Sequence, residues 1–223
     1  MKIIMNRFMM EIPLEENQVS VISIENPAAY TCILKEIWKQ TQGDEGEVIL
    51  FDGEKCKNIA KEIECIFNPF SLDCNNKRIL TKLYQELKEE SDSVLLEEFM
   101  TINSQIVKYL DKLIYQVSYP LKCNLELDVV NLLKLYNVEV DTEDSTLLEN
   151  LVNYLRISSQ ILKTRIFIFV GLKQYLTQDE LDKLYEFAFY EKFHLVIIEA
   201  VHSPCIKGEK GWILDKDLCI IEV

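Results

Sequence analysis

Three runs dominated by β-branched and aromatic residues limit the folds that this chain can adopt. They are VSVISI (19–24), RIFIFVG (165–171) and HLVIIEA (194–200). Strands that are apolar at nearly every position need cover on both faces, and such strands pair in parallel when helices connect them. Because helical spacing fills the segments between the runs, the pattern predicts an α/β fold with a mostly parallel sheet. EVILF (47–51) and LCIIEV (218–223) are predicted as further strands.

Capping residues indicate where several helices begin. Asn26 suits the N-cap of a helix that follows the first strand. Thr177 opens the sequence TQDE, which is a capping box for a later helix. A third helix is predicted to start at Asp144 or Ser145, after a short strand at 138–140.

Residues 55–119 differ in character from the segments around them. This segment contains no glycine, and apolar residues recur in it every three or four positions. This spacing predicts a helical hairpin whose long helix has about 25 residues. The chain is therefore expected to form a discontinuous α/β head from residues 1–57 and 138–223, with an α-helical leg inserted at 58–137.

The composition favours a soluble protein of the cytoplasm. The longest apolar runs have about half of the roughly 20 residues that a membrane-spanning helix needs. The amino-terminal apolar run is broken at Asn6 and Arg7, so it does not resemble a signal peptide. The seven cysteines form no CxxC pair, which argues against a disulfide framework. The net charge of −13 alone argues against a nucleic-acid partner.

The usual motifs of catalytic sites are absent from the sequence. It contains no GxxxxGK[ST] or GxGxxG loop to hold phosphates, and no GxSxG turn. It has only two histidines, so a three-histidine metal site is impossible. The chain is therefore expected to work by binding and not as an enzyme.

Two alternatives remain open beside this interpretation. Asp52 and Glu199 each follow an apolar strand, as do the acids that hold magnesium in NTPases, so a degenerate NTPase or nuclease is one of them. A cap at the end of each strand explains the same acids. The second alternative is a scaffold whose helical leg recruits protein partners.

Two acidic clusters lie on either side of the short helix near 127–136. They include Glu126 and Asp128 on one side and Asp141 and Asp144 on the other. Calcium prefers six to eight oxygen ligands of this kind, although the spacing is not that of an EF-hand. A solvated acidic turn is the other interpretation of these residues.

Basic residues recur along the leg at helical spacing, where they would suit phosphate contacts. They are Lys55, Lys57, Lys61, Lys77, Arg78, Lys82, Lys108 and Lys112. Acidic neighbours such as Glu54 and Glu62 dilute them, so an ordinary solvated surface is the alternative.

The closing third of the chain, from ILKTRIFIFVGLKQYLTQDELDKLYEF to GWILDKDLCIIEV, resembles the type II-A CRISPR-associated adaptation protein family called Csn-two. The opening VSVISIEN and VILFDGEKCKNIAKEIECIF are similar to the strands and the start of the leg in that family. The resemblance covers nearly the whole chain.

The resemblance implies a homotetrameric ring of α/β heads, related to phosphate-loop ATPases but without a phosphate loop or ATPase activity. It implies that the ring threads linear double-stranded DNA ends through a lysine-lined hole and needs Ca²⁺ for its conformation. It also implies a role in spacer acquisition beside the CRISPR adaptation integrase and effector nuclease. On this basis we expect the eight basic residues to contact DNA, and Glu126, Asp128, Asp141 and Asp144 to bind calcium.

Overall fold

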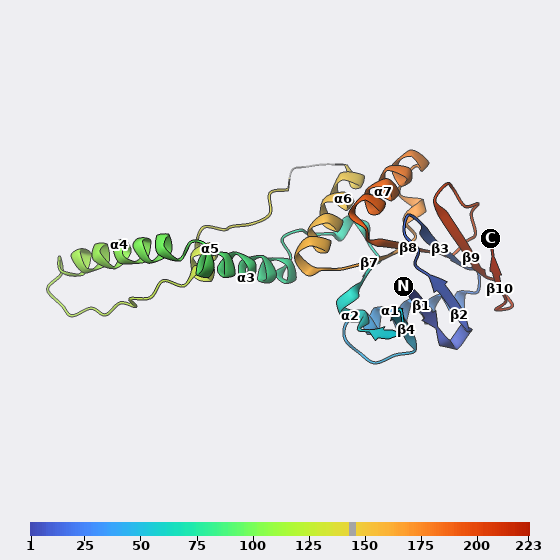
Figure 1. Cartoon of the computed structure of the whole chain (residues 1–223), viewed down its shortest axis with the longest axis horizontal. Coiled ribbons are helices and arrows are strands. Elements are labelled where there is room, and N and C mark those ends of the chain that lie inside the picture. Colours follow the sequence, from blue (N-terminus) through green and yellow to red (C-terminus); the bar gives the residue numbers. More distant parts are fainter. Residues whose placement is uncertain (143–145) are drawn as a thin grey trace. The chain divides into compact units, whose positions relative to one another are not determined.

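The computed structural model describes residues 1–142 and 146–223 and divides the chain into two compact units. We call residues 1–74 and 143–223 the head unit and residues 75–142 the leg unit. The head unit combines two sheets with helices, and the leg unit is helical (Figure 1). The predicted α/β class with an inserted helical segment is therefore confirmed.

A six-stranded sheet organises the head unit, in the order β10-β9-β3-β8-β7-β6. All neighbouring strands pair in parallel except β10, which is antiparallel to β9. The strands are β3 (Val19–Ile24), β6 (Ile63–Ile66), β7 (Ile166–Val170), β8 (His194–Glu199), β9 (Glu209–Leu214) and β10 (Ile220–Glu222). The predictions for β3, β7 and β8 are confirmed, whereas β6 and β9 were not predicted.

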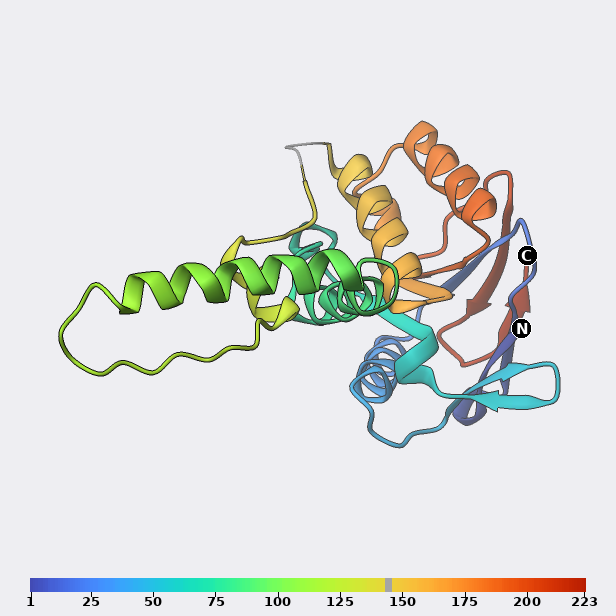
Figure 2. The ribbon, with the colours of Figure 1, turned by 60° about the vertical axis from the view of Figure 1, so that its left-hand side comes forward.

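Helices cover both faces of this sheet, as the sequence predicted (Figures 1 and 2). On one face, Ile166 and Ile168 share a buried cluster with Ile33 and Ile37. The other face carries the edge-to-face contact of Phe167 with Phe193. The covering helices are α1 (Pro27–Thr41) on the first face, and α6 (Leu147–Ile157) and α7 (Gln178–Glu191) on the second. Each large apolar side chain buried in this way contributes about 1.5–3 kcal/mol.

The amino-terminal residues add a second sheet of four antiparallel strands, in the order β2-β1-β4-β5. Its strands are β1 (Lys2–Met5), β2 (Met10–Pro13), β4 (Val48–Asp52) and β5 (Lys55–Lys57), with a 3₁₀ turn η1 (Asn6–Phe8) between the first two. The predicted strand at 47–51 corresponds to β4, but it belongs to this sheet and not to the parallel one. Only its alternate residues Val48 and Leu50 are fully buried, because one face alone packs on the core.

The helix caps follow the sequence closely. The Asn26 side chain accepts hydrogen bonds from the backbone N–H groups of Ala28 and Ala29, and Thr177 forms a capping box. Helix α6 has Thr146 as its N-cap, while the predicted starts Asp144 and Ser145 lie outside the described residues. The remaining short elements of the head unit are α2 (Ile59–Glu62), η2 (Pro69–Ser71), a π-helical turn η3 (Ser158–Leu162) and η4 (Leu172–Gln174).

The leg unit contains α3 (Lys77–Ser93), α4 (Leu96–Ile114) and α5 (Val129–Leu135). Helix α4 has 19 residues, shorter than the 25 or so predicted, because Val94 and Leu95 interrupt the helical run. The two ends of the unit are joined by the Asn75 amide, which donates to the Val140 carbonyl at 3.0 Å and accepts from its N–H at 2.8 Å. The predicted strand at 138–140 is therefore wrong, since this segment pairs with a side chain.

The boundaries between the units also differ from those predicted. Residues 58–74 belong to the head unit, because Ile63–Ile66 form a parallel edge strand beside β7. Residues 138–142 belong to the leg unit, where the Tyr84 hydroxyl donates to the Val138 carbonyl at 2.9 Å.

A buried glutamine joins α1 to the antiparallel sheet. The Gln40 amide donates to the Val48 carbonyl at 2.9 Å and accepts from the Val48 N–H at 3.1 Å. The side chain thus satisfies both backbone groups of a buried strand residue.

We predict that Gln40→Ala lowers the free energy of unfolding by about 2–4 kcal/mol, because it leaves these two groups buried without partners. Urea denaturation followed by circular dichroism measures the change. Gln42→Ala is the control, since Gln42 is exposed and its replacement should change stability by at most about 0.5 kcal/mol. Equal effects of the two substitutions would contradict the prediction.

Candidate functional site

The turn between β3 and α1 occupies the position where phosphate-loop proteins hold a nucleotide, at the carboxyl end of a parallel strand. Here the Asn26 side-chain oxygen accepts from Ala28 N at 3.0 Å and Ala29 N at 3.1 Å. Its amide nitrogen donates to the Lys216 carbonyl at 2.9 Å. Pro27, the first residue of α1, has no N–H to offer. The backbone N–H groups at the start of α1 are therefore already bonded to a side chain of the same protein.

The two strand-end acids considered for magnesium lie on different sheets. Asp52 ends β4 and accepts from Arg165 at 3.2 Å, with Lys57 at 3.7 Å. The hydrogen bond from Arg165 holds the Asp52 pKa below its usual value. Glu199 ends β8, is 5% exposed and accepts from the backbone N–H of Lys173 at 3.0 Å. Burial raises the Glu199 pKa. Each acid thus has its own structural partner, as expected of strand-end caps.

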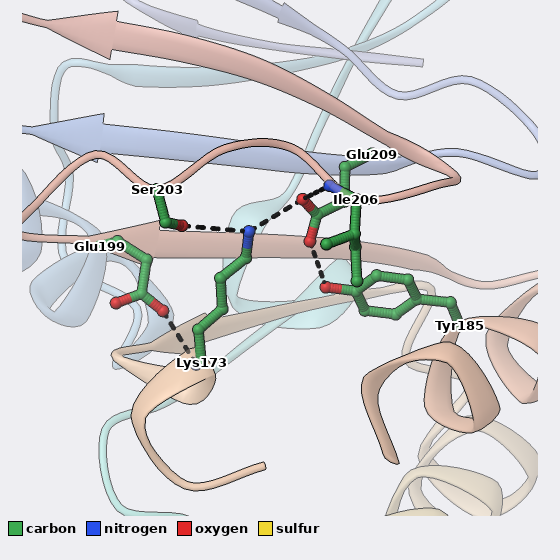
Figure 3. Close-up of polar contacts among 6 residues, drawn as sticks. All are labelled: Lys173, Tyr185, Glu199, Ser203, Ile206 and Glu209. Carbon is green, nitrogen blue, oxygen red and sulfur yellow. Dashed lines mark hydrogen bonds and ion pairs between the residues drawn. The ribbon is translucent and has the colours of Figure 1, made fainter. Parts of the chain in front are cut away.

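A buried polar cluster lies between the end of β7, the start of β9 and α7 (Figure 3). The Glu209 carboxylate is its centre, with a side chain that is 0% exposed. It accepts from Lys173 Nζ at 2.8 Å, from the Tyr185 hydroxyl at 2.6 Å and from the backbone N–H of Ile206 at 2.9 Å. Lys173 Nζ also donates to the Ser203 hydroxyl at 3.4 Å.

This cluster balances its own charge and hydrogen bonds. Burial raises the pKa of the Tyr185 phenol, which keeps the hydroxyl protonated as a donor to Glu209. The segment 200–208 carries both Ser203 and Ile206, so the cluster fastens this connection to the body of the head unit. We therefore assign it a structural role. Sequence reasoning missed it, because Lys173 and Glu209 are 36 residues apart and stand in no motif.

The eight basic residues predicted to contact DNA are divided between the units. The head unit carries Lys55 and Lys57 on β5 and Lys61 on α2. The leg unit carries the other five on α3 and α4, namely Lys77, Arg78, Lys82, Lys108 and Lys112. All are exposed except Lys57, which is half-buried. Within the described part of the chain, Lys57 alone among the eight makes an ion pair.

The described residues among the acids predicted to bind calcium do not form a cage. Asp128 caps α5, where its carboxylate accepts from the N–H groups of Val130 and Asn131. Glu126 and Asp141 are exposed, and Asp144 lies outside the described residues. Across residues 1–142 and 146–223, no group of three or more His, Cys, Asp or Glu side chains is placed to hold a metal ion. The described acids are therefore not gathered into a site, and calcium binding stays a prediction.

A family model described as CRISPR-associated protein (Cas_Csn2) matches residues 40–218, which is most of the chain. The chain belongs to the Csn2 family. The resemblance found in the sequence is thereby confirmed.

Two relatives in the Csn2 family match nearly the full length. The CRISPR-associated protein Csn2 of Streptococcus agalactiae is 22% identical over 212 residues, covering 94% of this chain and 93% of the relative. The protein of the same name from Enterococcus faecalis is 22% identical over 218 residues, covering 95% of each.

Solved structures of ABC transporter ATP-binding proteins are more distant from this chain. An ATP-binding cassette in its ADP conformation is 13% identical, with 92% of this chain and 79% of the other covered and a TM-score of 0.44. A putative ATP-binding protein from Pyrococcus furiosus is 12% identical, with 91% and 88% covered and a TM-score of 0.37. Scores this low support no conclusion about fold or function. Among the described helices, none is long and apolar enough to cross a membrane.

We predict that Lys173→Met lowers the free energy of unfolding by about 3–5 kcal/mol, because it leaves the Glu209 carboxylate buried without its cation. Adding Glu209→Gln should restore most of the loss, which a double-mutant cycle in urea measures. Lys2→Met is the control, since its ion pair with Glu11 is exposed and worth at most about 1 kcal/mol. A double variant as unstable as Lys173→Met would contradict the prediction.

Proposed function

We propose that this Csn2-family chain acts in the cytoplasm as a non-catalytic ring that binds the ends of double-stranded DNA during CRISPR spacer acquisition. In this proposal four copies form the ring, and the CRISPR adaptation integrase and effector nuclease are its partners. Family membership supplies the CRISPR context.

The observation that carries the DNA-binding proposal is a set of exposed cations without ion pairs. Arg78 and Lys82 lie one turn apart on α3, and Lys108 and Lys112 one turn apart on α4. All four are exposed and make no ion pair within the described residues. Cations in this state are available to phosphate oxygens, which supply most of the affinity of sequence-independent DNA binding.

The ring reconciles these cations with the acidity of the chain. A net charge of −13 per copy repels DNA at long range. A closed assembly can turn the basic surfaces of several copies towards one hole and leave the acidic surfaces outside. The proposal therefore requires self-association, and a single copy is expected to bind DNA poorly.

The closed turn at Asn26 supports a role without nucleotide chemistry. Its side chain takes the backbone N–H groups that a phosphate would need. Asp52 and Glu199 are each engaged in separate contacts, which gives no support to a magnesium pair. We therefore propose a binding protein and not an enzyme.

Calcium dependence is proposed on the family resemblance alone. The described acids form no cage for the ion, so no step of DNA binding is proposed to depend directly on calcium. Its place in the proposal is limited to the conformation of the ring.

We expect linear duplex DNA to bind and covalently closed circular duplex of the same sequence to bind far more weakly, since only a free end can enter a closed ring. Gel shifts with calcium and with a chelator measure both. Affinity should fall steeply with salt, because phosphate contacts release counterions. Equal affinity for the two topologies would contradict end binding.

One double variant tests the role of the leg cations in this experiment, and one single variant is its control. Arg78→Ala with Lys82→Ala removes two cations per copy and should weaken binding and reduce the salt dependence. Lys183→Ala removes an exposed lysine from α7 that is outside the proposed surface, and should change neither.

We also expect the mass in solution, measured by light scattering with calcium, to equal four chains. Replacing calcium by a chelator should change the hydrodynamic radius, because calcium is proposed to hold the ring conformation. A magnesium buffer is the control for divalent charge. A single-chain mass in every buffer would contradict the ring, whereas a tetramer unchanged by the chelator would contradict only the role of calcium.

A further inference from the structure

Four apolar side chains form an exposed ridge along α4 and the residue before it. They are Leu95, Ile102, Tyr109 and Leu113, with exposed fractions of 47%, 47%, 64% and 53%. Residues spaced by seven and four positions lie on the same side of an α-helix, so the four line up along its length. Large apolar side chains exposed in a continuous row typically mark a contact surface.

The leg unit covers the adjoining side of α4 with its own chain. Phe99, Ile106 and Leu110 are half-buried there. The segment after α4 runs back along the helix (Figures 1 and 2), and the Asn103 amide donates to the Leu125 carbonyl at 3.3 Å. The ridge is therefore an uncovered row beside this packed side, whereas Leu96 and Met100 are also exposed but lie further round the helix.

Charged and polar residues border the ridge in an ordered sequence. Glu98, Gln105 and Lys112 each stand three positions after a ridge residue, and all three are exposed. They are seven positions apart, so they run parallel to the ridge on one side of it. The border is acidic at the start of α4, neutral in the middle and basic at the end. Reversing its direction therefore exchanges the two charges.

We infer that a second copy of this chain lies antiparallel on the ridge, so that Glu98 faces the partner subunit's Lys112 and Lys112 faces the partner subunit's Glu98. Gln105 then faces the partner subunit's Gln105, where two amides can pair. A parallel copy related by two-fold symmetry would place the two charged borders on opposite edges of the contact, so neither Glu98 nor Lys112 would gain an ion pair from the other border. This inference rests on the proposed ring, which requires contacts between copies of the chain, and it names one surface where such a contact forms.

This arrangement separates the two lysines of α4 by role. Lys112 forms an ion pair between copies and acts in assembly, so it leaves the set of cations proposed for DNA, and Arg78, Lys82 and Lys108 remain in it. Lys108 lies further round the helix from the ridge, so it remains available to phosphate. Glu97 also points away from the ridge, because it lies one residue, or 100° of helix rotation, from Glu98.

Charge exchange tests the contact in the full chain. Glu98→Lys and Lys112→Glu each set like charges against one another twice in the pair, and each should raise the dissociation constant of the assembly by about tenfold. The double variant restores opposite charges and should return to the wild-type constant. Light scattering over a concentration series measures this, with circular dichroism to check folding.

Neighbouring charges on the same helix serve as controls. Glu97→Lys and Lys108→Glu make the same changes of net charge away from the ridge, and neither should alter assembly. A Glu97→Lys effect as large as that of Glu98→Lys would overturn the inference, as would a double variant that stays dissociated. Wild-type chains that remain single at every concentration would instead overturn the ring itself.

The DNA gel shift distinguishes the two roles of lysine. Lys112→Glu should lose DNA binding together with assembly, and adding Glu98→Lys should restore both. A double variant that assembles but no longer binds DNA would show that Lys112 contacts phosphate, and would overturn its assignment to assembly.

Discussion

The parallel sheet of the head unit must be covered on both faces, and the rest of that unit follows from this constraint. Ile166 and Ile168 project to the face of α1, while Phe167 and Phe169 alternate with them and are equally buried. Neither face can be left to water without exposing large apolar side chains. The amino-terminal antiparallel sheet completes the cover beside α1, which explains why a short chain carries two sheets.

The connection from β8 to β9 shows how a segment without a helix is fastened to such a sheet. Parallel strands are usually joined through a helix that packs on the sheet and buries its own backbone groups. Residues 200–208 have no helix, and the Glu209 cluster provides the missing attachment through Lys173, Tyr185 and Ile206. A buried carboxylate is tolerated here because every contact supplies a hydrogen to it.

Local sequence patterns predicted the elements whose apolar runs and caps agree, and missed those that depend on distant partners. Strands β3, β7 and β8 and the caps Asn26 and Thr177 were predictable for this reason. Strand β6 contains Glu64, which in the sequence resembles an exposed residue of a helix. In the structure Tyr154 and Ser158 donate hydrogen bonds to it. Strand β9 begins with Glu209 and Lys210, whose partners lie elsewhere in the chain.

The candidate site was predictable by residue type but not by partner. The spacing of the basic residues predicted that they are exposed, and seven of the eight are. Whether a cation is free for phosphate depends on which acids lie near it. Lys57 meets Asp52 because strands β4 and β5 pair with each other, and the sequence alone does not predict that pairing. Similarly, the sequence alone allows Asp128 to be a metal ligand or a helix cap. The two backbone N–H groups that donate to it identify it as a cap.

Helix α4 has three different surfaces, which the net charge of the chain does not reveal. One side is packed by the leg unit itself, the ridge from Leu95 to Leu113 is apolar and exposed, and the remaining side is mostly polar and charged. An exposed apolar ridge on an isolated chain is a liability for solubility, and the proposed self-association would remove it while ordering the bordering charges. In the proposed assembly, the contact that hides the ridge would also fix the direction of Lys108 on every copy, so one helix surface would control both assembly and the display of cations.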